Sequence, residues 1–121
     1  MTAREQATVS VFVVTNQMQA QPGRQKELVA LLRRFATTMH AEPGGVHYSV
    51  HRPIGDDSGP LTVIQAYASV KAFQDHGDWM RTRVPELASL LAAAPTPPVL
   101  LEQVALSGHV RETFGIQLLG V

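Results

Sequence analysis

The sequence predicts an α+β fold of the ferredoxin-like kind, with one antiparallel sheet and the element order β-α-β-β-α-β. Short runs rich in β-branched residues are typical of strands, and they alternate with stretches that have the apolar spacing of helices. Two strand-like runs follow each other directly, joined by the turn-forming loop "PIGDDSGP". At 121 residues the chain is long enough for one domain with its own core. We therefore expect both helices on one face of the sheet.

The first third of the chain predicts a strand and a long helix. The run "TVSVFVVT" (residues 8–15) is β-branched and too short for a typical helix, so we expect a strand there. After the turn "NQMQAQPG", apolar residues recur at helical spacing: Leu28, Leu31, Leu32, Phe35 and Met39. Arginine and lysine lie between them, which predicts an amphipathic helix of about five turns. Pro43 and two glycines should end it.

Three further strands are predicted over residues 46–52, 61–68 and 99–106. A sheet with one face in water should alternate polar and apolar residues, but the first strand is apolar on both faces and the last one nearly so. The second face therefore needs a cover, and a second copy of the chain is the simplest one. We expect a homodimer with the two sheets face to face.

A second helical region lies between the third and fourth strands. Ser69 is the expected N-cap, with Val70 and Phe73 facing inward. Gly77 is expected to stop this helix, and Pro85 should break or kink the next one.

The domain itself is expected to span residues 8–106. Residues 1–7 are polar and predict a disordered arm. Residues 107–121 predict a C-terminal extension, either an extra strand or an arm that reaches the partner subunit.

Composition excludes several classes of function. The chain has no cysteine, so neither disulfides nor thiolate catalysis is available. Lysine plus arginine equal aspartate plus glutamate at 10 each, which leaves no basic field for nucleic acid or an anionic membrane. No apolar run approaches the ~20 residues of a membrane span, and "MTAREQATVS" lacks the apolar core of a signal peptide. We therefore expect a cytoplasmic protein.

The stretch "GGVHYSVHR" places His47 and His51 four residues apart, a zinc-binding spacing if the segment is helical. The segment is rich in strand formers, however, so these two residues and Ser49 should share one face of a strand while Tyr48 takes the other. Four residues of strand span ~13 Å, whereas two nitrogens on one zinc ion lie within about 4 Å of each other. We therefore predict that these histidines do not share a metal, and that the protein has no metal site.

The segments "EPGGVHYSVHR" and "LTVIQAYASVKAFQDH" resemble the antibiotic biosynthesis monooxygenase family, and the resemblance extends over residues 9–104. It consists of a Pro-Gly turn, a strand with a tyrosine and a His-Arg end, a strand with an amide two residues before an aromatic, and a short helix that ends in histidine. The matching positions are Pro43, Gly44, Tyr48, His51, Arg52, Gln65, Tyr67 and His76. The resemblance implies a dimeric α+β barrel. It also implies one of several activities: quinol or anthrone oxidation, haem degradation, isomerisation, or a role not known.

The departures from the family pattern bear on the activity. The family commonly has glutamate at Gln65 and often tryptophan at Tyr67. The haem-degrading branch resembles this chain at Asn16 but has tryptophan at His76, and its haem ligand corresponds to Arg83, which cannot ligate iron. Haem is therefore a minority alternative, in which His76 would reach the iron. The polyketide-oxidising branch has an aromatic residue at Tyr67, as here, but a hydroxylated one at Phe73.

The resemblance implies a site for cofactor-independent oxidation of an aromatic molecule by O2. Such chemistry needs a base near neutral pH, donors for an oxyanion and aromatic walls. We expect His76 or His51 as the catalytic base. The expected substrate-binding residues are the donors Asn16 and Gln65, the walls Tyr67 and Trp79, and in addition Tyr48 and Arg83.

Each of these residues also has a structural interpretation. Tyr67 is equally explained as a half-buried strand aromatic, Asn16 as a turn residue, and Trp79 as part of the core. Two other functions stay open: a small-molecule or haem-binding dimer without turnover, and an isomerase or cyclase that uses the same pocket.

Overall fold

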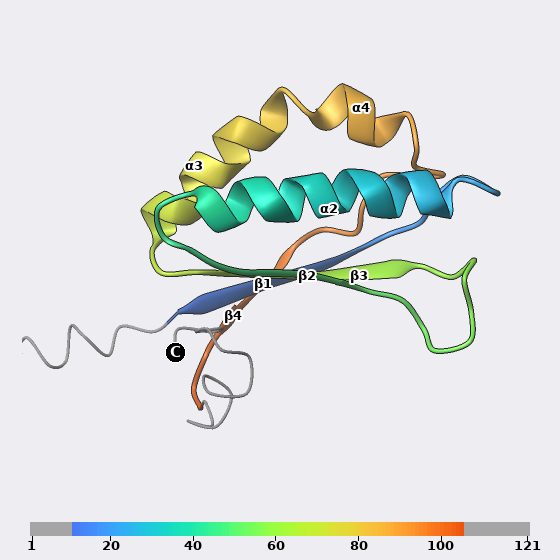
Figure 1. Ribbon diagram of the computed structural model, residues 1–121. Coiled ribbons are helices and arrows are strands. Elements are labelled where there is room, and N and C mark those ends of the chain that lie inside the picture. The colour runs from blue at the N-terminus through green and yellow to red at the C-terminus, as the bar shows by residue number, and fades with distance from the viewer. Residues whose placement is uncertain (1–10, 106–121) are drawn as a thin grey trace, which may run out of the picture.

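Four antiparallel strands form one sheet in the order β2-β3-β1-β4 (Figure 1). The computed structural model describes residues 11–105. Its elements are β1 (Phe12–Met18), α2 (Gln25–Ala41), β2 (Gly45–His51), β3 (Leu61–Tyr67), α3 (Val70–Arg81), α4 (Val84–Ala88) and β4 (Val99–Glu102). The predicted ferredoxin-like order is confirmed, and α4 is a short helix added before the last strand.

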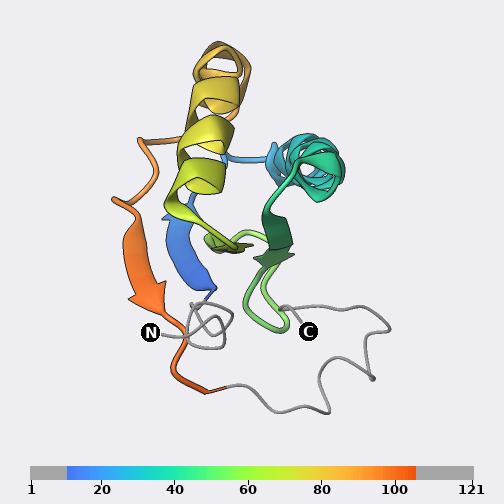
Figure 2. The same cartoon turned by 90° about the vertical axis from the view of Figure 1, so that its left-hand side faces the viewer.

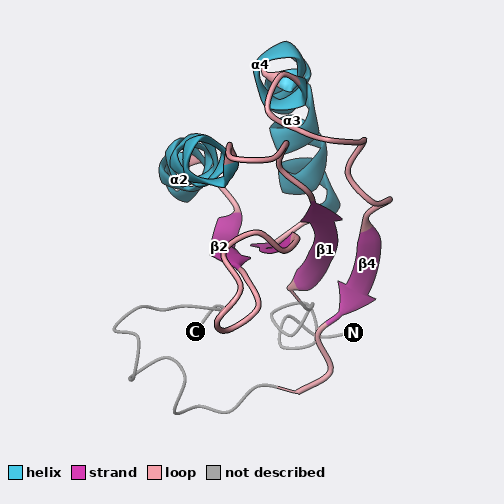
Figure 3. Cartoon of the chain, turned by 90° about the vertical axis from the view of Figure 1, so that its right-hand side faces the viewer, coloured by secondary structure: helices cyan, strands magenta, loops and turns pink. Residues whose placement is uncertain are grey.

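The three helices within residues 11–105 all lie on one face of the sheet. Figures 2 and 3 show α2 over β2, with α3 and α4 over β1. The layer between is filled by apolar side chains that the predicted periodicities place inward, among them Leu28 and Leu32 of α2 and Val63 of β3. A smaller buried cluster joins Val14 of β1 to Tyr67 of β3. This second cluster adjoins the candidate active site.

The Pro-Gly turn brings the end of α2 close to the start of α3. Gly44 has a φ of +80°, a conformation that side chains rarely adopt, and a Cβ there would lie 2.7 Å from Ala72 Cβ. The Gly44 carbonyl accepts a hydrogen bond from the Ala68 amide at 2.9 Å. The residue before the turn, Glu42, is thereby held beside α3.

The N-terminus of α3 partly matches the prediction. The Ser69 hydroxyl accepts a hydrogen bond from the Ala72 amide at 3.1 Å, so the predicted N-cap is confirmed. Phe73 is half-buried, but the inward position predicted for Val70 is wrong, because this side chain is 61% exposed. Its place in the first turn of α3 directs it toward the rim of a cavity.

The predicted stop at Gly77 is also wrong, since α3 continues without interruption to Arg81. A glycine inside a helix costs only about 1 kcal/mol relative to alanine. The side chains on either side of it, His76 and Met80, both pack inward and hold the helix together. Pro85 does act as predicted, because it stands in the first turn of the separate helix α4.

Two strand boundaries differ from the prediction. The first strand extends to Met18 because its pairing with β3 continues to Leu61. The last strand ends at Glu102, where its pairing with β1 stops opposite Phe12. The predicted arm and the predicted C-terminal extension lie outside the described residues.

The face of the sheet away from the helices carries apolar side chains. Val13 pairs with Leu101, and the next residue, Val14, points into the core instead. Ile64 of β3 lies on the same helix-free face, since the buried Val63 beside it faces the helices. These positions agree with the pattern from which dimerisation is predicted, and the dimer stays a prediction.

Candidate active site

His76 is a buried histidine held by a carboxylate. It lies on α3, is 5% exposed, and its Nδ1 is 2.9 Å from Oε1 of Glu42. The carboxylate can only accept, so Nδ1 is the donor, and in a neutral imidazole Nε2 is then the nitrogen with the lone pair. Within residues 11–105 the ring makes no other hydrogen bond. The pair thus presents an oriented imidazole whose second nitrogen can take a proton.

Three aromatic rings surround His76. The ring of Trp79, three residues further along α3, stacks on the imidazole with centroids 5.6 Å apart. Tyr67 of β3 and Tyr48 of β2 follow at 5.8 and 6.4 Å. The structure therefore brings together four residues of the predicted site, and the imidazole lies in surroundings from which water is largely excluded.

Trp79 connects this cluster to α2 and to Arg83. Its ring meets Phe35 edge-on at a centroid distance of 5.3 Å. The guanidinium carbon of Arg83 lies 4.5 Å from the Trp79 centroid, a cation–π contact. Trp79 is therefore both a wall for His76 and a part of the core, and Arg83 covers the outer side of that wall.

The predicted donors Gln65 and Asn16 lie on the helix-facing side of the sheet. The Tyr67 hydroxyl donates to Oε1 of Gln65. Asn16 Oδ1 is buried and has no hydrogen-bond partner among the described residues. Gln65 pairs with Val14 and Asn16 with Val63, so the two amides lie on neighbouring strands, offset by two residues. A buried carbonyl without a partner is costly, and a bound hydroxyl group would satisfy it.

Both tyrosines of the cluster are hydrogen-bond donors rather than bases. Burial raises the pKa of Tyr67, and the neighbouring Tyr48 and Glu42 raise it further. Burial alone raises the pKa of Tyr48. At neutral pH each phenol therefore keeps its proton, which leaves His76 as the group in this cluster that can accept one.

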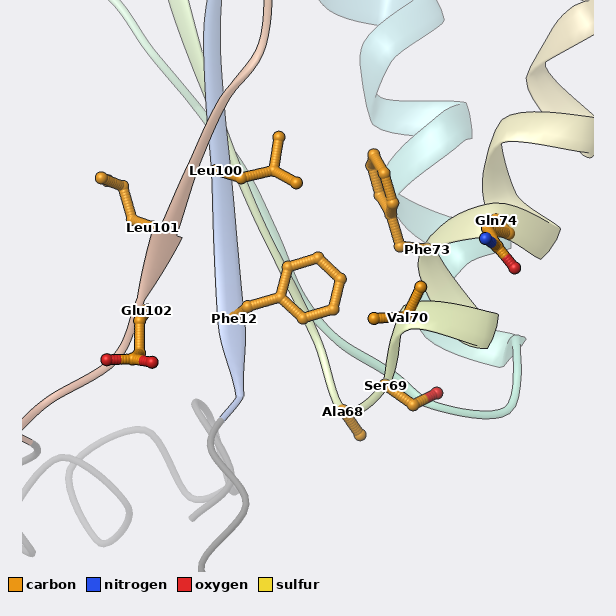
Figure 4. Close-up of a pocket in the computed structure, with 9 residues that line it drawn as sticks. All are labelled: Phe12, Ala68, Ser69, Val70, Phe73, Gln74, Leu100, Leu101 and Glu102. Atoms are coloured by element: carbon orange, nitrogen blue, oxygen red, sulfur yellow. The ribbon is translucent and has the colours of Figure 1, made fainter.

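A cavity of about 580 Å³ opens beside the cluster, between α3 and β4. Figure 4 shows Phe12, Phe73 and Leu100 pointing toward one another across it, while Leu101 points away. The lining residues are Phe12, Ala68, Ser69, Val70, Phe73, Gln74, Leu100, Leu101 and Glu102. None of the predicted site residues lines it. Phe73 and the buried Tyr67, whose rings meet edge-on at 5.4 Å, lie between the cavity and His76.

The structure does not bring His51 to His76. Tyr48 and Val50 of β2 pack toward the helices, so the alternating residues His47, Ser49 and His51 belong to the opposite face of the strand, as predicted. Nε2 of His47 is 2.8 Å from Ser49 Oγ, and Nε2 of His51 is 2.7 Å from the same oxygen. The rings lean toward each other, so their nitrogens are closer than the backbone spacing suggests.

Sequence reasoning missed Glu42 and the position of Phe73. Glu42 occupies the C-cap of α2, where the helix dipole disfavours a negative charge. A carboxylate at a helix C-terminus was therefore the one sign in the sequence that a hydrogen-bond partner offsets its unfavourable interaction with the helix dipole. The Phe73 ring lies one turn before His76 on the same helix, and only the fold shows that a cavity borders it.

The cluster does not suit haem. The imidazole of His76 is 5% exposed and does not line the cavity between α3 and β4, so a haem in that cavity would not meet its Nε2. Arg83, at the position of the family's haem ligand, has its guanidinium over the Trp79 ring. In the part of the chain that the structure describes, no three His, Cys, Asp or Glu side chains are grouped so as to hold a metal ion.

None of the helices within residues 11–105 has the length and apolar character needed to cross a membrane.

Comparisons with known proteins agree with this fold. The family model described as "Antibiotic biosynthesis monooxygenase" matches residues 11–78, more than half of the chain. A search of curated proteins gives no significant match.

Solved structures share the fold at low sequence identity. Rv0793 from Mycobacterium tuberculosis is 22% identical, with a TM-score of 0.68, and the match covers 82% of this chain and 100% of that one. SnoaB, a cofactor-independent oxygenase from Streptomyces nogalater whose structure is that of a mutant, is 15% identical, with a TM-score of 0.68 and coverage of 82% and 98%. PA3566 from Pseudomonas aeruginosa is 21% identical, with a TM-score of 0.65 and coverage of 79% and 96%. The chain belongs to the antibiotic biosynthesis monooxygenase family.

Proposed function

We propose that this protein is a cofactor-independent monooxygenase that oxidises a flat quinol- or anthrone-type aromatic molecule, such as a polyketide, with O2. The observation that supports this proposal most strongly is the buried His76, which Glu42 orients and aromatic rings enclose. SnoaB has this fold and is a cofactor-independent oxygenase, which supports the proposal at the level of the family. We further propose a cytoplasmic homodimer joined through the helix-free sheet faces.

His76 acts as the base in this proposal. Its Nε2 takes a proton from the reacting carbon of the substrate, and Glu42 stabilises the imidazolium that forms. The unpaired Oδ1 of Asn16 is the candidate group to accept a hydrogen bond from a substrate hydroxyl, while Tyr67, whose hydroxyl hydrogen is donated to Gln65, forms a wall of the site. Removal of the proton leaves a resonance-stabilised carbanion.

The carbanion supplies the electrons for the oxidation. It transfers them to O2 and forms a carbon–oxygen bond, which gives a peroxide on the reacting carbon. Loss of the second hydrogen from that carbon breaks the oxygen–oxygen bond. One oxygen atom stays as a carbonyl group, and the other leaves as water with the two protons lost from that carbon, one returned by His76 and one released when the oxygen–oxygen bond breaks. The substrate is thus its own reductant, and no further electron donor is needed.

The cavity between α3 and β4 is the proposed entrance for the substrate. Its apolar lining suits a flat aromatic molecule. Phe73 borders the cavity and lies one helical turn from His76, so the substrate would reach the imidazole when this half-buried ring and the ring of Tyr67 behind it move apart.

The test is oxygen uptake with a panel of anthrones and quinols. We expect His76→Ala to lose at least about 100-fold in kcat/KM, the usual contribution of a general base, and Glu42→Gln to lose less because the imidazole remains. His40→Gln is the matched control, since His40 is exposed on α2. Equal uptake by the His76→Ala variant and the native protein contradicts the assignment.

A small-molecule binder without turnover is the second candidate function. The observation that favours it is that His76 does not line the cavity. A binder would quench the fluorescence of Trp79, the single tryptophan, when an anthrone is added, but would consume no O2 above buffer. That combination of results would replace the oxygenase proposal.

A further inference from the structure

Two imidazoles converge on one hydroxyl group at the edge of the sheet. Nε2 of His47 lies 2.8 Å and Nε2 of His51 lies 2.7 Å from Oγ of Ser49. The two nitrogens are therefore no more than about 5.5 Å apart, the two hydrogen bonds laid end to end. They belong to the outermost strand, β2, on the face away from His76. The candidate active site does not use them.

This separation is close to that of two nitrogens on one metal ion. Metal–imidazole bonds of about 2 Å place two nitrogens about 4 Å apart when they bind from opposite sides. Closing the remaining gap requires a movement of at most about 1.5 Å between the rings. In the single chain the His51 side chain is exposed, on the strand at the edge of the sheet, while His47 and Ser49 are half-buried. The backbone positions of His47 and His51 are too far apart for a shared metal, but their rings lean toward each other and bring the two Nε2 atoms close together.

The protonation of the three groups also suits a metal ligand. A hydroxyl has one hydrogen, so Ser49 donates to one ring and accepts from the N–H of the other. One Nε2 is already free of a proton, and the other becomes free when its proton moves to Nδ1. The cross-strand partners of His47, Ser49 and His51 are uncharged. They are Ala66, Ile64 and Thr62 of β3.

The arrangement selects for one class of ion. Ligands that approach from opposite sides are typical of tetragonal Cu²⁺, whereas a tetrahedral zinc ion needs its two nitrogens closer together. Cu²⁺ also binds imidazole more tightly than the other common divalent metals. We propose that His47 and His51 bind Cu²⁺ through their two Nε2 atoms, with the ion in the place between them that the Ser49 hydroxyl occupies in this structure. This site is independent of the proposed oxygenase function.

Copper titration of the full-length protein tests the proposal. The native protein and His40→Gln should each bind one Cu²⁺ per chain, with an electron paramagnetic resonance spectrum that shows two coordinated nitrogens. His47→Gln and His51→Gln should each bind at least about 10-fold more weakly and lose the two-nitrogen pattern, because even outer-shell partners of a metal are worth that much. Ser49→Ala keeps both imidazoles and should bind within a few-fold of the native protein.

Three results would overturn the site. These are no stoichiometric binding by the native protein, equal binding by His47→Gln, His51→Gln and His40→Gln, or a loss in Ser49→Ala as large as in either histidine variant. Circular dichroism and sedimentation of every variant, compared with the native protein, show that fold and assembly are unchanged. The histidine variants should keep these properties, since among residues 11–105 the side chains of His47, Ser49 and His51 form hydrogen bonds only with one another.

Discussion

At the scale of single residues, Asn16 is the clearest conflict between stability and function. Its Oδ1 is buried without a partner among the described residues, in a strand where valine would be favoured. Proteins tolerate such a group where a ligand satisfies it. The buried oxygen agrees with the proposed role of Asn16 in substrate binding, and the turn role that the sequence leaves open does not apply, since the strand continues past this position to Met18.

Replacing Asn16 with valine should separate the two effects. We expect the free energy of unfolding to rise by about 1 kcal/mol or more, because the unpaired polar group is removed. Turnover of the anthrone or quinol substrate should fall, since the oxygen that accepts a hydrogen bond from its hydroxyl group is lost. Urea unfolding and oxygen uptake measure the two quantities. The control is Thr15→Val on the opposite face of the same strand, which should leave turnover unchanged. A stabilised Asn16→Val variant with full activity would assign Asn16 no role in binding.

The same scale shows what a sequence can reveal about a site. Tyr67 and His76 could be singled out because they match a family pattern over a short distance. The partner of His76 could not, because Glu42 is 34 residues away and meets it only through the Gly44 turn. Long-range pairs of this kind depend on the packing of elements and leave little trace in local periodicity. The carboxylate at a helix C-terminus was the one local sign.

At the scale of elements, periodicity predicted most of the fold. The long helix α2 and strands β2 and β3 lie within one or two residues of their predicted bounds, since each has a buried face with its own apolar repeat. The sequence predicts α3 too short, because Gly77 is interpreted as the end of the helix. Its tertiary packing outweighs the low helix propensity of one glycine.

Gly77 and Gly44 should respond in opposite ways to alanine. A Cβ at Gly77 meets no atom within 4 Å, so Gly77→Ala should stabilise the protein by about 0.5–1 kcal/mol through helix propensity. Gly44→Ala should destabilise it by more than about 1 kcal/mol, because of its positive φ and the 2.7 Å approach to Ala72 Cβ. Thermal unfolding of the two variants beside the native protein measures both. Stabilisation by Gly44→Ala would show that this turn does not constrain α2 against α3.

At the scale of the whole molecule, the sheet has two unlike faces. The helices cover one, and the other presents Val13, Ile64 and the half-exposed Leu101. An apolar face of this kind is stabilised when a second sheet packs on it, and two-fold pairing places the same residues of two chains against each other. His47, Ser49 and His51 lie on the same face, at the outer strand β2. The proposed copper site would therefore border the proposed dimer interface.

A charge in the centre of that face should separate the subunits. We expect the native protein to sediment as a dimer and Val13→Lys as a monomer, because a buried lysine without a partner costs several kcal/mol. Ile54→Lys adds the same charge on the fully exposed loop between β2 and β3, and it should remain a dimer. Analytical ultracentrifugation over a range of protein concentrations measures both. A native protein that is monomeric throughout, or a Val13→Lys variant that dimerises as tightly as Ile54→Lys, would place any interface elsewhere. In that case the apolar pattern of β1 would need a cover from within the same chain.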